Sequence, residues 1–361
     1  MVCPLDWGLG HATRCIPIIR ELEKQNTEVI IGANDRPLEL LKKEFPHLQF
    51  IKFNGYNISY PRSGNMNLKM FFSAPKILWK IFQEHQQLKK IIREHKIDIV
   101  ISDNQYGLWN KNIPCVFITH QIMIKCPSYL KFLEPLLYLM NLFFINKYNE
   151  CWIPDLETKE NLSGDLSHKY PLPKNARFIG TLSRFNQSTN QPINQSTNYD
   201  IMVILSGPEP QRTMFEEKII DQICEVNLKT LIVRGTPEQN ENKKLSDKIT
   251  VISHLESEKM KEAILSSKII LSRSGYSTVM DLVALGKKAI FIPTPGQTEQ
   301  EYLARFYKQK KTFYSEPQST FNLKRCIAEA EKHKGLQIPS TENKLADTIN
   351  HLITNTKITL L

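Results

Sequence analysis

The sequence lacks the features that mark secreted, zinc-binding or membrane-spanning proteins. Its seven cysteines are odd in number, and no two of them form a Cys-x-x-Cys pair. Disulfide frameworks and zinc sites both need paired or clustered ligands, so we expect reduced thiols, no metal and no cofactor. The longest apolar run, 135–145, is shorter than the roughly 18 residues that cross a bilayer. No basic and then apolar leader follows Met1. These absences predict a cytoplasmic protein.

The composition that remains is that of a globular protein, with 41% apolar and 23% charged residues. A chain of 361 residues is too long for one core and suits two domains. Residues 186–198 read NQSTNQPINQSTN, a polar repeat with almost nothing to bury. We therefore place a flexible linker at 185–199, between a first domain at 1–184 and a second domain at 200–361 that ends in a helix from about 342 to 352.

The net charge of +10 calls for an anionic partner. No nucleic-acid-binding module is recognisable, so nucleic acid is not expected. Basic residues are dense between positions 62 and 96, where they alternate with bulky apolar residues. This mixture is typical of a protein that rests on an anionic membrane, although a solvated helix face beside an ordinary core explains it equally well. The residues concerned are Lys69, Lys76, Lys80, Lys89, Lys90 and Arg93.

Both halves alternate short β-rich runs with helical stretches. The runs are nearly all apolar and do not alternate in polarity, which indicates parallel strands covered on both faces. Such repetition predicts two doubly wound, Rossmann-like α/β domains. In the first half the runs are 2–5, 28–31, 50–53, 97–102, 116–119 and 151–153. In the second they are 201–205, 230–233, 250–253, 269–271, 289–292 and 312–314.

A glycine loop at 6–14 follows the first strand and opens a helix. Gly8 and Gly10 permit a tight turn and a close approach of the backbone to a ligand. The spacing is not that of a dinucleotide fingerprint. His11 stands at the helix N-terminus, and an imidazole there is suited to accept a proton near neutral pH. His11 is either a general base or a helix cap.

A second loop of the same kind lies at 271–278. Ser274 and Gly275 leave a strand, and the N–H groups of the following helix form an anion cradle. Arg273 adds a positive charge, and Asp281 stands one turn further on, where an acidic residue can reach a ribose hydroxyl. The alternative is structural, with Ser277 as the N-cap and Asp281 as a first-turn acid.

Residues 272–306 resemble the C-terminal domain of family 28 glycosyltransferases. The shared pattern is a serine–glycine loop, an acidic residue in the next helix, a Pro-x-Pro loop, and a Glu-Gln pair before an aromatic residue. The loop ending in His11 and the segment 180–184 resemble the corresponding parts of the family's first domain. The resemblance implies the GT-B fold, in which two Rossmann-like domains face each other across a cleft.

The resemblance also implies roles for individual residues. In the second domain, the nucleotide-sugar-binding domain, Ser274 and Gly275 would face the diphosphate and Asp281 the ribose. The donor sugar's hydroxyls would be held by Glu299 and Gln300, the diphosphate would be neutralised by Arg184, and the uracil would meet the segment of His254. In the first, acceptor-binding domain, His11 would be the general base, with Gly8, Gly10, Asp103 and His120 on the acceptor side.

One segment departs from the family's pattern. Its second glycine-rich phosphate loop is replaced here by 206–212, where two prolines remove N–H donors and Glu209 would repel phosphate. Arg212 could compensate for that charge. This departure puts the phosphate role of the loop in doubt and points to a divergent member with a different acceptor.

The predicted reaction is an inverting, metal-independent transfer of a hexose or N-acetylhexosamine from a UDP-sugar to a hydroxyl acceptor. The acceptor is expected to be lipid-linked or part of the cell envelope, with the enzyme peripheral at the inner face of the membrane. Residues 10–15 also resemble nucleotide-sugar hydrolases of pseudaminic acid synthesis, in which His11 would activate water. A third alternative is a non-catalytic protein that only binds the nucleotide-sugar.

Overall fold

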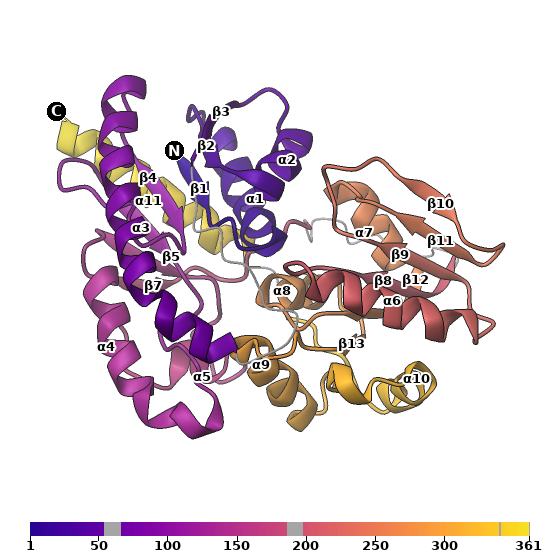
Figure 1. The fold of residues 1–361 in the computed structure, drawn as a ribbon. Coiled ribbons are helices and arrows are strands. Elements are labelled where there is room, and N and C mark those ends of the chain that lie inside the picture. The colour runs from indigo at the N-terminus through magenta and orange to yellow at the C-terminus, as the bar shows by residue number, and fades with distance from the viewer. Residues whose placement is uncertain (54–65, 186–197, 339–340, 361) are drawn as a thin grey trace.

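The computed structural model describes residues 1–53, 66–185, 198–338 and 341–360, which form two α/β units beside each other (Figure 1). The sheet of the first unit has the strand order β3-β2-β1-β4-β5-β6-β7, and every neighbouring pair in it is parallel. Its strands are β1 (Val2–Pro4), β2 (Ile30–Ala33), β3 (Gln49–Lys52), β4 (Val100–Asp103), β5 (Cys115–Ile118), β6 (Glu150–Ile153) and β7 (Ala176–Phe178).

Helices cover both faces of this first sheet, which is why its strands are apolar throughout. Apolar residues of α1 and α2 pack on one face, and those of α3 and the segment after α4 pack on the other. The helices are α1 (Leu9–Lys24), α2 (Asp35–Glu44), α3 (Met66–His95), α4 (Glu134–Ile145) and α5 (Asp165–His168), with a 3-10 helix, η1 (Ser128–Leu133), leading into α4.

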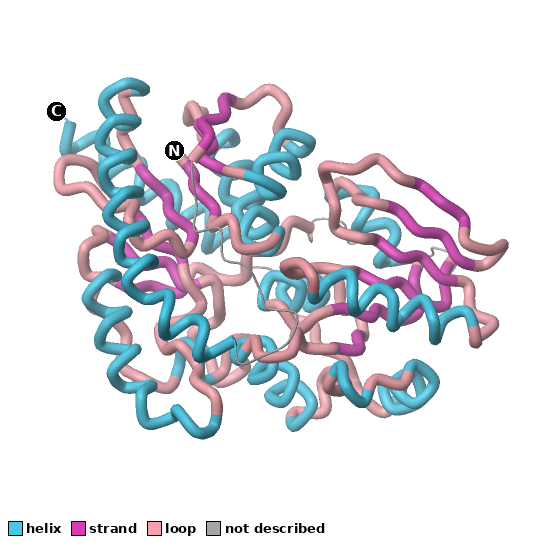
Figure 2. Tube along the Cα trace, viewed as in Figure 1, coloured by secondary structure: helices cyan, strands magenta, loops and turns pink. Residues whose placement is uncertain are grey.

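The second sheet, whose strands are magenta in Figure 2, has the order β10-β11-β9-β8-β12-β13-β14. Its edge strand β10 pairs antiparallel with β11, and the other pairs are parallel. Its strands are β8 (Tyr199–Ile204), β9 (Thr230–Val233), β10 (Asn242–Lys244), β11 (Ile249–Ile252), β12 (Ser267–Ser272), β13 (Ala289–Phe291) and β14 (Tyr314–Ser315). Its helices are α6 (Gln211–Cys224), α7 (Ser257–Leu265), α8 (Tyr276–Ala284), α9 (Thr298–Gln309), η2 (Gln318–Thr320) and α10 (Leu323–Glu331).

The predicted fold class, two doubly wound Rossmann-like domains, is confirmed. Every predicted β-rich run overlaps a strand of the structure. Two strands were not predicted, and both lie at sheet edges. Strand β7 has only three residues, and all three residues of β10 are exposed and polar. Neither strand carries the apolar run by which a buried strand is recognised.

The last helix, α11 (Glu342–Leu360), is longer than predicted and packs on the first domain. Gln25 at the end of α1 donates from Nε2 to the Ala346 carbonyl at 3.1 Å. Just before the helix, Thr341 accepts at its Oγ1 from the backbone N–H of Thr181 at 2.9 Å. The chain therefore crosses back after the second sheet, and the final helix, assigned above to the second domain, contacts the first. The predicted linker falls almost wholly outside the described residues, so its flexibility stays a prediction.

One apolar helical stretch is longer than the sequence pattern indicated. Helices η1 and α4 run on continuously over Ser128–Ile145, and this span is long and apolar enough to cross a membrane by length and composition alone. The sequence estimate counted only 135–145 and missed the turn of 3-10 helix that precedes it. One such helix is weak evidence for a span, and its exposed apolar residues are considered below.

The strand orders place the loops that carry polar residues. In each sheet the order reverses beside the first strand, between β1 and β4 and between β8 and β12. Ligands of doubly wound sheets bind at such a switch point, outside the carboxyl ends of the strands. The loops 5–8 and 273–275 leave these ends, and Ser277 Oγ donates to the Gly10 carbonyl at 2.7 Å. The two switch points therefore meet across the cleft between the domains.

Candidate active site in the interdomain cleft

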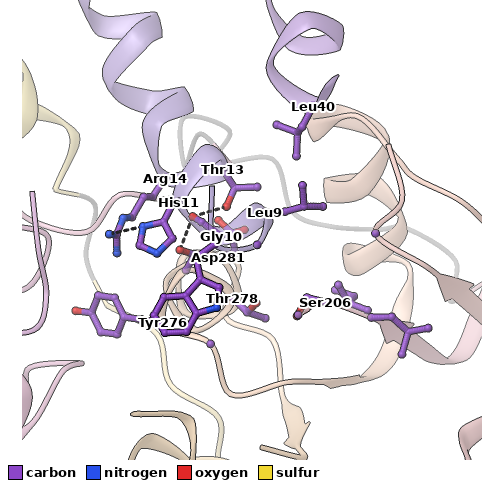
Figure 3. A pocket seen from close by; sticks show the side chains of 18 of the residues that line it. Leu9, Gly10, His11, Thr13, Arg14, Leu40, Ser206, Tyr276, Thr278 and Asp281 are labelled. Atoms are coloured by element: carbon purple, nitrogen blue, oxygen red, sulfur yellow. Dashed lines mark hydrogen bonds between the residues drawn. The ribbon is translucent and has the colours of Figure 1, made fainter. Parts of the chain in front are cut away.

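A cavity at this meeting point is lined by both domains. The first domain contributes the start of α1 and His120 after β5, and the second contributes the loops after β8, β11 and β12 and the start of α9. Figure 3 shows His11 and Arg14 together at the start of α1, with Tyr276, Thr278 and Asp281 of α8 nearby. The cavity therefore joins the two loops that the sequence singled out.

Glycine is required at positions 8 and 10 for different structural reasons. Gly8 has a φ of 82°, a left-handed conformation that strains any residue with a side chain. Gly10 lies where the domains touch, because a β-carbon there would stand 3.2 Å from Ser277 Oγ. The first glycine makes the turn into α1, and the second permits the close approach of α8.

His11 is oriented by a buried carboxylate. Its Nδ1 lies 3.1 Å from Oδ2 of Asp103, which stands at the end of β4 with a fully buried side chain. Burial alone would raise the pKa of Asp103, but Arg14 and His11 outweigh it and hold that pKa below its usual value. A carboxylate that binds one ring nitrogen leaves the other nitrogen free to accept a proton. Asp103, expected on the acceptor side, is thus the partner of His11 in the structure.

Arg14 is a residue of this site that the sequence analysis missed. Its guanidinium donates to both carboxylate oxygens of Asp103, with Nε at 2.7 Å from Oδ2. It also lies 2.9 Å from Nδ1 of His120 and 2.8 Å from Nδ1 of His11. Its position three residues after His11, on the same face of a helix, was the signal that could have found it.

His120 links the two domains. Its Nε2 lies 2.7 Å from Oε1 of Glu299 on α9, and its ring stacks on Tyr276 at 4.1 Å between centroids. Gln121 also donates to Glu299. Burial is the largest influence on His120 and lowers its pKa, although Glu299 acts in the opposite direction. Glu299, expected to hold hydroxyls of the donor sugar, is therefore engaged by the first domain in this structure.

The start of α8 has the form of an anion cradle. Its N-cap is Gly275, and no side chain caps the first turn. Ser277, the alternative N-cap, donates instead to the Gly10 carbonyl. Gly275, Tyr276, Ser277 and Thr278 line the cavity. Since the first N–H groups of a helix have no partner within it, they are available to a bound anion.

Asp281 and Arg184 lie in the same cavity and are paired with each other. The Asp281 carboxylate accepts from Nε of Arg184 at 3.2 Å and from the Ser183 hydroxyl at 2.8 Å. Burial raises the pKa of Asp281 despite the charge of Arg184. Asp281 is not in the first turn of α8, so the structural alternative of a first-turn acid does not apply. Its ribose role stays a prediction.

Two predicted donor-binding side chains point elsewhere. The Arg273 guanidinium donates to the carbonyls of Ile292, Pro293 and Gln211 and lies over the ring of Phe215. Ser274 donates to the carbonyl of Gln300. Both side chains are fully buried and tie the loop after β12 to its neighbours. This placement corrects the expectation that Arg273 adds charge at the ligand. The expectation that Ser274 faces the diphosphate stays a prediction.

Gln300 and the loop after β8 are also held by internal contacts. Gln300 lines the cavity, but its Oε1 accepts the N–H of Thr294 at 2.8 Å. Glu209, expected to repel phosphate, is neutralised by Arg212, whose Nε lies 2.6 Å from Oε1 of the carboxylate. Its Oε2 accepts a hydrogen bond from the Thr213 hydroxyl at 2.8 Å. Arg212 is thereby used to compensate the charge of Glu209 and does not line the cavity.

His254, after β11, lines the cavity with the apolar side chains of Leu40 and Met260. Burial, with the charges of Arg184 and Lys43, lowers the pKa of His254 to about 4. Its Nε2 is buried and has no hydrogen-bond partner among the described residues. His254 therefore adds no charge to this end of the cavity at neutral pH, and it brings there a polar atom that has no partner among the described residues.

The comparisons with known proteins agree with this architecture. Residues 212–352 match the family description "Glycosyltransferase family 28 C-terminal domain", and residues 6–130 match "Glycosyl transferase family 1". A UDP-N-acetylglucosamine--N-acetylmuramyl-(pentapeptide) pyrophosphoryl-undecaprenol N-acetylglucosamine transferase of Haemophilus influenzae is 22% identical over 82% of this chain and 79% of its own length. An uncharacterized glycosyltransferase of Methanosarcina acetivorans is 23% identical over 81% and 79%.

A solved structure resembles the whole chain. The crystal structure of MurG from Acinetobacter baumannii superposes with a TM-score of 0.55 over 97% of this chain and 98% of that one, at 15% identity. At that level of identity the similarity concerns the fold. It extends over both domains and supports the two-domain arrangement that the cleft requires.

Proposed function

Since the chain is a glycosyltransferase of the GT-B fold with a family 28 C-terminal domain, we propose that it transfers a hexose or an N-acetylhexosamine from a UDP-sugar to an acceptor hydroxyl. The observation that carries this proposal is the meeting of His11, held by Asp103, with the uncapped start of α8 across one cavity. A base and an anion cradle are the two parts that displacement of a nucleotide by a hydroxyl needs.

The proposed base is His11. With Nδ1 donating to Asp103, Nε2 accepts the proton of the acceptor hydroxyl as its oxygen attacks the anomeric carbon. The positive charge that the imidazole gains is stabilised by the Asp103 carboxylate. Because the attack comes from the side opposite the nucleotide, one displacement inverts the anomeric configuration.

The proposed site for the leaving diphosphate is the start of α8. The N–H groups of the first turn and the positive end of the helix dipole stabilise the charge that develops there. Arg184, which lines the same cavity, adds a cation. This arrangement supports a reaction that uses no metal and no further cofactor. The end of the cavity beside His254 is the proposed site of the uracil ring of the nucleotide.

The name of the Haemophilus influenzae relative specifies UDP-N-acetylglucosamine and an undecaprenol-linked acceptor, which supports a UDP-sugar and a lipid-linked acceptor here. An exposed apolar face on the first domain adds to this. It is formed by exposed apolar residues of α3, η1 and α4, and helices α3 and α4 both lie at the left of the molecule in Figure 1. The face comprises Leu78, Trp79, Phe82, Tyr129, Phe132, Leu136, Leu139, Met140 and Phe143.

Basic residues accompany this apolar face. Lys76 and Lys131 are exposed beside it, and Lys147 lies over the ring of Phe143 at 4.6 Å. Apolar area of this extent with a basic surround suits an anionic lipid surface. We propose that the enzyme is cytoplasmic and docks here on the inner face of the membrane. Lys69, part of the predicted basic stretch, has no described side chain.

The test is product analysis. Purified protein is incubated with a panel of UDP-sugars and a polyprenyl-diphosphate-linked acceptor, and the products are identified by mass spectrometry and by NMR of the new anomeric centre. Transfer with inverted configuration is expected and should persist in EDTA. Release of free sugar and UDP at the same rate without acceptor would identify a hydrolase, and failure to turn over any UDP-sugar would refute the proposal.

A further inference from the structure

Within the described residues, Arg14 is the one buried cation that touches both His11 and His120. Its side chain is 2% exposed and its partner Asp103 is fully buried. A guanidinium at this depth orders its neighbours strongly, because each contact is made away from water. The groups that face His11 are Arg14 on α1, Asp103 on β4, His120 after β5 and Glu299 on α9.

The contacts of Arg14 decide the proton positions on His120. A guanidinium has donors only, so the Nδ1 of His120, 2.9 Å from Arg14, must be the unprotonated nitrogen. The ring proton then stands on Nε2 and is donated to Glu299 at 2.7 Å. A hydrogen-bonded chain therefore runs from Glu299 of the second domain through His120 to Arg14 of the first.

The Nδ1 of His11 lies within hydrogen-bond distance of both a donor and an acceptor. Its Nδ1 lies 2.8 Å from Nη2 of Arg14, which can only donate, and 3.1 Å from Oδ2 of Asp103, which when ionised can only accept. With the proton on Nδ1, Nε2 is free to take the proton of an acceptor hydroxyl. With the proton on Nε2, that nitrogen cannot act as a base. The balance between Arg14 and Asp103 therefore decides whether His11 is competent.

We propose that Arg14 is the positioning residue of the transfer reaction, compensating the charge of Asp103 and tying His11 to Glu299 of the opposite domain through His120. This inference rests on the proposed function. An isolated buried carboxylate beside His11 would favour the imidazolium, which cannot accept a proton. With Arg14 bound to both of its oxygens, Asp103 still orients the ring while its charge is largely compensated.

The first experiment measures the pH dependence of kcat/KM for wild type, Arg14→Gln and Arg14→Lys. Loss of the guanidinium should shift the acidic limb to higher pH by about one unit or more, because an uncompensated Asp103 favours the protonated base. KM for the UDP-sugar should change little, and Arg14→Lys should restore part of the shift. The matched control is Lys24→Gln, on the same helix, where the side chain is 65% exposed and paired only with Glu21.

A purely structural role for Arg14 predicts something different. It would lower kcat and the melting temperature without moving the acidic limb, and that result would overturn the proposal. Asp103→Asn gives an opposite sign to check, because Arg14 would then stand beside His11 uncompensated and the limb should move to lower pH. Asp103→Asn also keeps the proposal testable if Arg14→Gln fails to fold. If the acidic limb of its kcat/KM profile stays at the wild-type pH, that result counts against the proposal.

The second experiment does not depend on activity. In wild-type protein labelled with ¹⁵N-histidine, two-bond ¹H–¹⁵N spectra show which ring nitrogen carries the proton, with assignment by His120→Gln and His11→Gln. We expect His120 to be protonated on Nε2 and neutral at pH 7. A proton on Nδ1 of His120 would refute the inference even if transfer is observed. The expected spectrum without any transferase activity would instead refute the proposed function alone.

Discussion

The two walls of the cleft differ in how they carry charge. The wall of the first domain holds a compact cluster of ionisable side chains, Arg14, Asp103, His11 and His120, in mutual contact. The wall of the second domain offers an uncapped helix start, its two carboxylates Asp281 and Glu299 are held by Arg184 and His120, and the guanidinium of Arg273 is turned away. Side chains can move protons, whereas helix N–H groups can only hold an anion. The proposed function accordingly divides proton transfer and nucleotide binding between the first domain and the second.

The strongest test of this division is His11→Ala. A base acts in the transition state and contributes little to binding the nucleotide, so turnover should fall by about 10²–10⁴-fold while UDP affinity stays the same. Steady-state kinetics and calorimetry with UDP measure the two effects. Equal losses in turnover and affinity would show that the first wall also binds the nucleotide, and the comparison between the walls would break.

The second test concerns His254, which the comparison requires to be uncharged. Its pKa in the folded protein is about 4, below the usual value of 6.5. The unfolded chain therefore binds more protons in this interval, and the contribution of His254 to stability, complete above about pH 6.5, is lost as the pH falls towards 4.

Urea unfolding at pH 7 and pH 5 measures this contribution. Wild type should lose about 2 kcal/mol more than His254→Gln between the two pH values. The remaining histidines serve as an internal reference, because both proteins contain them. If the free energy of unfolding falls equally in the two proteins, His254 is charged in the folded protein, contrary to the description above.

The third test is Asp281→Ala, the carboxylate of the second wall. If Asp281 binds the ribose, UDP affinity should fall about tenfold, since a hydrogen bond to a charged group contributes roughly 1.5–3 kcal/mol. kcat at saturating donor should change much less. Asp281→Asn, which keeps the size of the side chain, separates loss of charge from loss of packing against Arg184. Unchanged affinity for UDP in calorimetry would leave Asp281 as a partner of Arg184 only.

The smallest expected effect lies outside the cleft. Trp79 and Phe82 are stacked at 5.7 Å and more than half exposed on the first domain. Replacing both by serine should weaken binding to anionic vesicles by roughly threefold to tenfold, and salt should weaken wild-type binding further. Met214, an exposed apolar residue of the second domain, is the matched control. If Met214→Ser weakens vesicle binding as much as the double variant, or wild type does not bind at low salt, the docking face is misplaced.

The two glycine loops and their histidine and serine–glycine patterns could be found from the sequence because each is local. A strand, a turn and a helix start within ten residues have a recognisable composition. The sequence analysis placed Asp103 and His120 on the acceptor side from the family resemblance, and the parallel sheet brings both to the start of α1, where Asp103 contacts His11 and His120 contacts Arg14. It failed for Arg273, because a loop sequence does not say which carbonyls its arginine will meet.

The sequence by itself determined the two doubly wound sheets, since buried parallel strands must be apolar on both faces and that requirement is written in short runs. Only the tertiary structure decided which charged side chains form pairs with each other. Asp281 is paired with Arg184 and Asp103 with Arg14. The contact of Glu299 with His120 joins residues 179 positions apart. Such pairings depend on how segments that are distant in the sequence pack together in the fold, and no local sequence pattern encodes this packing.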